Sequence, residues 1–208
     1  MAASEKELIT PDIIQEAMSY NAFQNLIDKC ISKGKTTGTM QSDELTEYTR
    51  LNRQRMKRLD KTSELNDSLK EKLQNMEEDL IWLVLAEGWC GDVAQSLPVI
   101  NKMAETTSNI DLKILLRTEN TDIMDQYLTN GGRSIPKLVC LQASSLQELG
   151  TWGPRPAKFQ QQAMKWKEDP EVSHEEWAEK LHKWYARDKT QSIQADFEKM
   201  IDKWSSKK

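Results

Sequence analysis

The chain has 208 residues, of which 30% are charged, and its mean hydropathy is -0.72. A chain of this length suits one domain with sizeable additions, and it needs no disulfide or metal staple to fold. The net charge of -4 gives no global electrostatic reason to bind nucleic acid or an anionic membrane.

The cysteine content also limits which class of protein this is. Cys30, Cys90 and Cys140 are too few and too widely spaced for a disulfide framework or a zinc site, so we expect no metal and no cofactor. No apolar run approaches the ~20 residues of a membrane span. The first residues lack the basic and apolar regions of a secretory signal, so we expect a cytoplasmic protein. Nothing in the sequence indicates the oligomeric state.

The first third of the chain predicts helices. Thr10-Pro11-Asp12 supplies an N-cap with proline at the first helical position. Apolar residues then recur at helical spacing in a single run that ends at Gly34. A second helical stretch begins near Ser42, breaks near residues 61–63 and continues to about Met76.

The middle of the chain alternates between strand and helix patterns. Three short apolar runs have the composition of strands buried on both faces: residues 80–85, 110–116 and 135–141. Helical segments lie between them, near residues 91–106 and 121–129. This order predicts crossover units and a sheet that begins parallel. A last strand near residues 146–151 follows a turn too short for a crossover, so it must form an antiparallel hairpin.

The C-terminal quarter is helical again. Ser173-His174-Glu175-Glu176 is a capping box, and a final helix begins near Thr190. We expect the helices of residues 1–78 and 171–208 to pack on a core of residues 79–170, because each carries an apolar stripe. The overall expectation is an α/β fold with a mixed sheet of about four strands.

One motif, Trp89-Cys90-Gly91-Asp92, lies where the first buried strand ends and a helix begins. A thiol at a helix N-terminus faces unpaired amides and the positive end of the helix dipole, which lowers its pKa and favours the thiolate. Gly91 lets the backbone turn tightly into the helix. Asp92 caps the same amides, but its negative charge opposes thiolate formation.

A second motif, Ser134-Ile135-Pro136, opens the third strand. A strand, Trp-Cys-Gly-X-X, a helix and a later Ile-Pro together resemble the thioredoxin family. Pro98, inside the helix after Cys90, matches the kinking proline of that family. The resemblance covers residue 79 to about residue 166, and the flanking helices look like those of a bacterial branch of the family.

The resemblance carries implications for fold and site. It implies a thioredoxin-like three-layer fold with N-terminal and C-terminal helical extensions. It also implies that Pro136 is a cis-proline beside Cys90, and that Ile135 offers backbone groups to an extended substrate peptide.

The sequence departs from the thioredoxin pattern at two positions. Thioredoxins carry Cys-Gly-Pro-Cys, whereas Val93 stands here in place of the second cysteine and cannot resolve a mixed disulfide. The buried acid that thioredoxins place six residues before the nucleophile is Val84 in this chain. An ordinary disulfide reductase is therefore not expected.

Two functions remain open. In the first, Cys90 performs monothiol redox chemistry and forms mixed disulfides with a protein or with a small thiol such as a thiol peptide. In the second, the chain is a non-catalytic binding module that uses the groove between Trp89 and Ile135. A Cys90 pKa well below ~8.5 favours redox chemistry, and a normal or raised pKa favours binding.

The remaining candidates have plainer interpretations. Cys30 lies on an apolar helix stripe and Cys140 in a buried strand, so we interpret both as small buried apolar residues. His174 and His182 lack the partners of a metal site, and we interpret them as surface residues.

A basic run from Arg50 to Lys61 leaves two interpretations open. Most such runs are solvated helix faces. The alternative is that one guanidinium, from Arg53 or Arg55, reaches Cys90 or a ligand held there. Only one of the two could serve, because they point to different faces of their helix.

Overall fold

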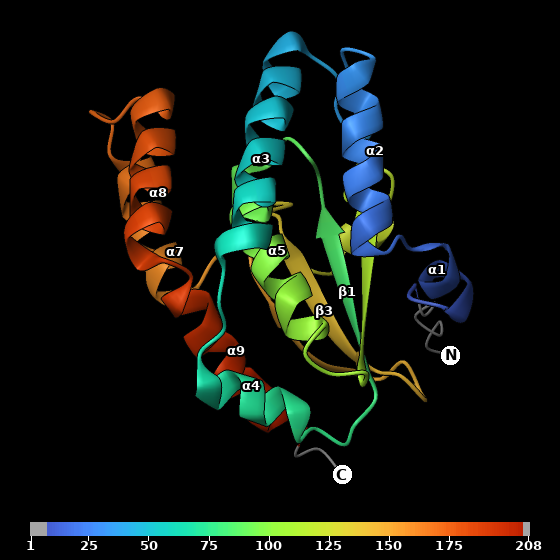
Figure 1. Cartoon of the computed structure of the whole chain (residues 1–208). Coiled ribbons are helices and arrows are strands. Elements are labelled where there is room, and N and C mark those ends of the chain that lie inside the picture. The colour runs from blue at the N-terminus through green and yellow to red at the C-terminus, as the bar shows by residue number, and fades with distance from the viewer. Residues whose placement is uncertain (1–7, 206–208) are drawn as a thin grey trace, which may run out of the picture.

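The computed structural model describes residues 8–205, which form a four-stranded sheet flanked by helices (Figure 1). The strands are β1 (Leu80–Ala86), β2 (Ile110–Leu116), β3 (Lys137–Gln142) and β4 (Glu148–Trp152). The helices that precede β3 are α1 (Pro11–Glu16), α2 (Tyr20–Ser32), α3 (Asp43–Thr62), α4 (Asp67–Gln74), α5 (Gly91–Ala104) and α6 (Thr121–Asp125). The helices that follow β4 are α7 (Ala157–Glu168), α8 (His174–Asp188) and α9 (Gln191–Trp204).

The sheet is mixed, with the strand order β2-β1-β3-β4. β1 pairs in parallel with β2 after the α5 crossover, and β3 and β4 form an antiparallel hairpin, both as expected. β3 runs antiparallel to β1, so the segment through α6 does not make a second parallel crossover. The α/β class and the four strands are confirmed.

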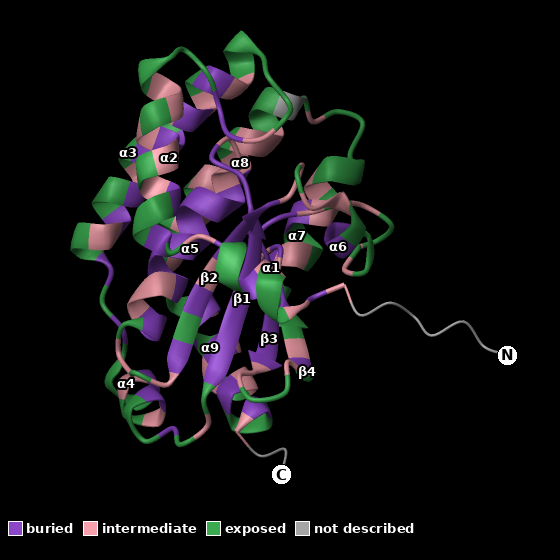
Figure 2. Ribbon diagram, turned by 90° about the vertical axis from the view of Figure 1, so that its right-hand side faces the viewer, coloured by how far each residue is buried: buried purple, intermediate pink, exposed green. Residues whose placement is uncertain are grey.

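β1 is buried along its whole length, which explains its uninterrupted apolar sequence (Figure 2). On one face, the ring of Trp82 contacts those of Phe197 and Trp204 in α9, with centroids 5.1 and 5.9 Å apart. α5 crosses the sheet in front of β1 and β3 (Figure 1). Packing on both faces of β1 therefore fixes the position of its C-terminal end, where the chain leads into α5.

The single helical run expected up to Gly34 is wrong, because the chain breaks between α1 and α2. The backbone of Met18 exchanges two hydrogen bonds with Ile114 at the edge of β2, at 2.9 and 2.8 Å. Ser19 then begins α2, since its side chain accepts a hydrogen bond from the amide of Ala22. The break satisfies backbone groups that an unbroken helix would not bring to the sheet.

The helices before and after the sheet also contact each other. α4 lies beside α9, where Lys72 forms a salt bridge with Asp202 and the Gln194 amide donates to the carbonyl of Glu64. The α7–α8 cluster is a second apolar cluster, apart from the main core. It consists of Phe159, Ala163 and Leu181, with Trp166, Trp177, Trp184 and Tyr185 packed against them. No helix within residues 8–205 is long and apolar enough to cross a membrane.

Candidate functional site

Cys90 is the N-cap residue of α5, so its sulfur lies where the helix leaves its first amides unpaired. Its Sγ donates a hydrogen bond to the backbone oxygen of Ile135, 3.3 Å away and 45 residues later in the chain. The Ile135–Pro136 peptide bond is cis. The fold therefore brings the two sequence motifs together.

Gly153 supports this arrangement from the end of β4. Its φ is +117°, and a Cβ atom at this position would lie 2.1 Å from the backbone oxygen of Pro136. Neither the conformation nor the space admits another residue. The chain after β4 thus packs directly against the Ile135–Pro136 segment.

The thiol of Cys90 is held protonated. Burial raises its pKa to about 12, and the negative charge of Asp92 adds to the effect. The amides of Val93 and Asp92 and the charge of Arg155 lower the pKa by less. The expected thiolate at the helix N-terminus is therefore outweighed by desolvation.

Asp92 is buried and does not cap α5, contrary to the sequence-based interpretation. Arg155 forks onto its carboxylate, with Nε 2.9 Å from Oδ1 and Nη2 2.5 Å from Oδ2. Tyr185 donates a third hydrogen bond to Oδ1, at 2.8 Å. Burial raises the pKa of Asp92, and Arg155 and Tyr185 oppose that rise. The charge of Arg155 is therefore paired with Asp92, and its effect is the smallest of those that lower the pKa of Cys90.

The interpretation of His182 as a surface residue is wrong. This half-buried side chain lies against Gly91, where an added Cβ would be 3.2 Å from its Cε1. Burial, followed by the nearby charge of Arg55, lowers the pKa of His182 to about 4, so the imidazole is neutral near pH 7. The absence of a side chain at Gly91 therefore allows His182 to approach closely. The side chain of His174 lies outside the described part of the structure.

These residues line one cleft of about 890 Å³ beside Cys90, and its lining also includes residues of α3 and α8. A volume of this order suits a small molecule or a short peptide. The charged residues that line the cleft are Glu44, Arg55, Asp92, Arg117, Arg133, Arg155 and Lys167. The N-terminal and C-terminal helices thus complete a site centred on the sheet.

Arg55 is the member of the basic run that reaches this cleft. Arg53 points elsewhere and forks onto Asp28, with two N–O distances of 2.9 Å. Of the two arginines, Arg55 therefore lines the cleft, whereas the arginine whose charge acts on the Cys90 thiol is Arg155, outside the basic run.

Two further arginines were missed from the sequence. Arg117, directly after β2, stacks its guanidinium 4.7 Å from the ring centre of Trp89. Arg155 lies between Pro154 and Pro156, and these prolines were the only local sign that its position is fixed.

A buried acid does lie near Cys90, although Val84 is apolar and buried. Glu87 is fully buried three residues before Cys90. Its carboxylate accepts hydrogen bonds from the hydroxyls of Thr37 and Thr118, at 2.5 and 2.7 Å, and from the amide of Thr118, at 3.0 Å. Through these hydrogen bonds, Glu87 connects the loop before α3 to the loop after β2.

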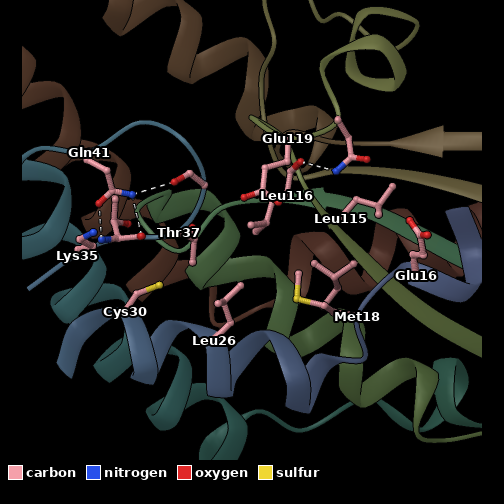
Figure 3. Close-up of a pocket in the computed structure, with 14 residues that line it drawn as sticks. Glu16, Met18, Leu26, Cys30, Lys35, Thr37, Gln41, Leu115, Leu116 and Glu119 are labelled. Carbon is pink, nitrogen blue, oxygen red and sulfur yellow. Dashed lines mark hydrogen bonds between the residues drawn. The ribbon is translucent and has the colours of Figure 1, made fainter. Parts of the chain in front are cut away.

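The other two cysteines lie away from the cleft. Cys140 is buried in β3, where desolvation raises its pKa to about 12. Cys30 is only half-buried, which corrects the sequence-based interpretation, and it lines a separate cavity of about 710 Å³ (Figure 3). Its neighbours there include Leu26 and Thr37. Neither thiol lines the cleft of Cys90.

A cysteine at a helix N-terminus, placed against a cis-proline on a mixed four-stranded sheet, defines a thioredoxin-like fold. The family model described as Thioredoxin matches residues 38–170, which is more than half of the chain, so this protein belongs to that family. No curated protein matches the sequence significantly.

Two solved structures share the fold. One is a protein of unknown function from Pseudomonas aeruginosa, with 20% identity and a TM-score of 0.60. The other is an HIV epitope scaffold, with 18% identity and a TM-score of 0.58. Each alignment covers 96% of this chain and 98% of the other chain. At these identities the similarity concerns the fold alone.

Proposed function

We propose that this protein is a thioredoxin-fold binding module that takes its ligand in the cleft beside Cys90. The state of Cys90 carries the proposal, because this half-buried thiol has Val93 where a second cysteine would stand. Burial and the charge of Asp92 raise its pKa to about 12, so the thiol is protonated near pH 7. Because the thiolate is the reactive form in disulfide exchange, such a residue is a poor nucleophile.

The surroundings of Cys90 support the same proposal. Val93, where a second cysteine would stand, is buried and cannot resolve a mixed disulfide. Cys30 and Cys140 lie outside the cleft. Turnover of a disulfide would therefore depend on a second thiol from solution.

The cleft offers an extended ligand several contacts. Ile135 lines the cleft next to the cis peptide bond, and Trp89 supplies an aromatic ring. The oxygen of Ile135 already accepts the weak S–H bond of Cys90, so a ligand N–H that pairs there displaces it. A protein segment or a small peptide fits this description.

Monothiol redox chemistry is the second candidate, and one observation favours it. The amides of Asp92 and Val93 stabilise negative charge on the sulfur, and Cys90 lines the cleft. In this case the Cys90 thiolate attacks a bound disulfide and releases one thiolate. A thiol from solution then attacks the mixed disulfide and frees Cys90.

The pH dependence of alkylation separates the two candidates. The protein is treated with iodoacetamide over pH 6 to 11, and mass spectrometry follows the modification of the Cys90 peptide. We expect the rate to be still rising at the highest pH. A plateau that gives a Cys90 pKa below ~8.5 would favour the redox candidate instead.

A further inference from the structure

The cleft beside Cys90 contains positive charge that the protein does not neutralise. Arg155 is paired with Asp92, and Arg133 with Asp125. Within residues 8–205, the cleft-lining cations Arg55, Arg117 and Lys167 form no salt bridge, and Glu44 is the acid that remains to oppose them. A cleft with excess charge of one sign attracts ligands of the opposite sign.

Arg55 is held in place by a chain of buried contacts. Its Nη1 donates to Oδ1 of Asn52 at 2.7 Å, and Asn52 is fully buried and donates in turn to the oxygen of Gly88 at 3.1 Å. Gly88 lies two residues before Cys90. The half-buried guanidinium of Arg55 therefore has a fixed position relative to the thiol, and most of its five donors remain free for an anion.

Arg117 is fixed against Trp89. Its guanidinium lies over the indole ring and donates to the backbone oxygen of Arg133 at 3.0 Å. Stacking on an aromatic face positions a guanidinium without neutralising its charge. The guanidinium groups of Arg55 and Arg117 thus line one cleft, and each is held in a fixed orientation.

Within residues 8–205, two buried polar atoms on cleft-lining residues also lack partners. The indole N–H of Trp89 is buried and has no acceptor among the described residues, and Nδ1 of His182 has no hydrogen-bond partner there either. Buried polar atoms without partners are costly and uncommon, so the wall of this cleft retains unused hydrogen-bonding capacity.

We propose that Arg55 and Arg117 form a carboxylate-binding site beside Cys90, and that the ligand is a short peptide or peptide end that carries a free carboxylate. A guanidinium matches the two oxygens of a carboxylate. Among the described residues, three unpaired cations against Glu44 leave a positive excess in the cleft, which favours an anionic ligand. This inference rests on the proposed binding function and names the class of ligand.

The test uses two synthetic pools of tripeptides that are identical except at the C-terminus. One pool ends in a carboxylate and the other in an amide, and retention by the protein is measured by equilibrium dialysis and mass spectrometry. We expect the acid pool to be retained at least about tenfold more strongly than the amide pool, since charge-assisted hydrogen bonds are the strong ones. We also expect this preference to weaken as salt increases.

Variants assign the effect to the two arginines. Arg55→Gln and Arg117→Gln should each reduce the preference for the acid pool by about tenfold. Arg58→Gln is the matched control, because Arg58 is an exposed arginine of the same helix that does not line this cleft, and it should change little.

The possible outcomes distinguish failure of the carboxylate site from failure of the proposed binding function. Equal retention of both pools, or a preference unchanged in both cleft variants, would overturn the carboxylate site while leaving the binding function intact. Retention of neither pool would overturn both.

Discussion

Tyr185 of α8 donates a hydrogen bond to Asp92 of α5, with Oη 2.8 Å from Oδ1, although the two residues are 93 positions apart. Asp92 is two residues from Cys90 and is the main charge that raises the pKa of its thiol. The C-terminal helices therefore set the electrostatic environment of a residue at the centre of the sheet. The first prediction follows from this contact.

Asp92→Asn should lower the pKa of Cys90 by about 1 unit or more. The substitution removes the negative charge that opposes the thiolate and leaves the positive charge of Arg155 uncompensated nearby. Alkylation by iodoacetamide near pH 8 should then become faster. The same change should cost about 1–3 kcal/mol of unfolding free energy, because buried Arg155 loses its ionic partner.

The matched control is Asp125→Asn, which breaks the exposed ion pair with Arg133. This variant should leave the alkylation of Cys90 unchanged. An equal acceleration in both variants would show that general loss of negative charge, and not Asp92 itself, governs the thiol.

The stability of the protein should depend on His182 between about pH 6.5 and about pH 4. The folded state holds the pKa of His182 near 4, whereas its ordinary value is 6.5. The unfolded chain therefore binds a proton in this window that the folded chain does not, so stability falls as the pH is lowered through it. Above pH 6.5 both states are neutral at this residue, and it contributes no pH dependence.

Denaturant unfolding at several pH values measures this contribution. His182→Gln should flatten the fall between pH 6.5 and pH 4. In an NMR titration, Arg55→Gln should raise the pKa of His182, because the charge of Arg55 is one cause of its depression. An identical titration in Arg55→Gln would contradict the electrostatic interaction between the two side chains.

Val93→Cys should confer the ability to reduce insulin disulfides, which the wild type should lack when no small thiol is added. The substitution supplies a second thiol one helical turn after Cys90, and that thiol can resolve a mixed disulfide. The activity should remain low because Asp92 still raises the pKa of Cys90. Val93→Ala serves as the control for altered packing at this buried position. Strong turnover by the wild type alone would require Cys30 or Cys140 to act as the resolving thiol.

Gly153→Ala should destabilise the fold by more than about 2 kcal/mol, through its left-handed conformation and its overlap with the Pro136 oxygen. Gly131→Ala is a matched control with φ +74° and no atom within 4 Å of the added Cβ. It should cost only about 1 kcal/mol. Equal losses of unfolding free energy in the two variants would mean that the contact with Pro136 contributes nothing.

The sheet could be predicted from sequence because its signals are local. β1 is an unbroken apolar run since both of its faces are covered, and the turn before β4 is too short for anything except a hairpin. The break between α1 and α2 has no such signal. It depends on backbone hydrogen bonds between Met18 and Ile114, which are distant in sequence.

The site was predictable only around its two motifs. The junction of strand and helix, together with the resemblance to thioredoxin, predicts Cys90, Trp89 and Ile135 as site residues. Arg155 and Tyr185 reach Asp92 from 63 and 93 residues away, and apart from the prolines that flank Arg155 nothing in their own segments marks them. The direction of the Cys90 pKa shift was left open by the sequence, because desolvation depends on how distant side chains pack around the thiol.

The separation of the α7–α8 cluster from the main core has a dynamic consequence. Helices with their own small apolar core can open as a local cooperative unit at a lower free-energy cost than global unfolding. This unit carries Trp177 and His182, which form part of the cleft wall, so its opening widens the entrance while the sheet keeps its pairing. Amide hydrogen exchange should therefore be faster in α8 than in β1, and the rate of ligand entry follows the opening of two helices.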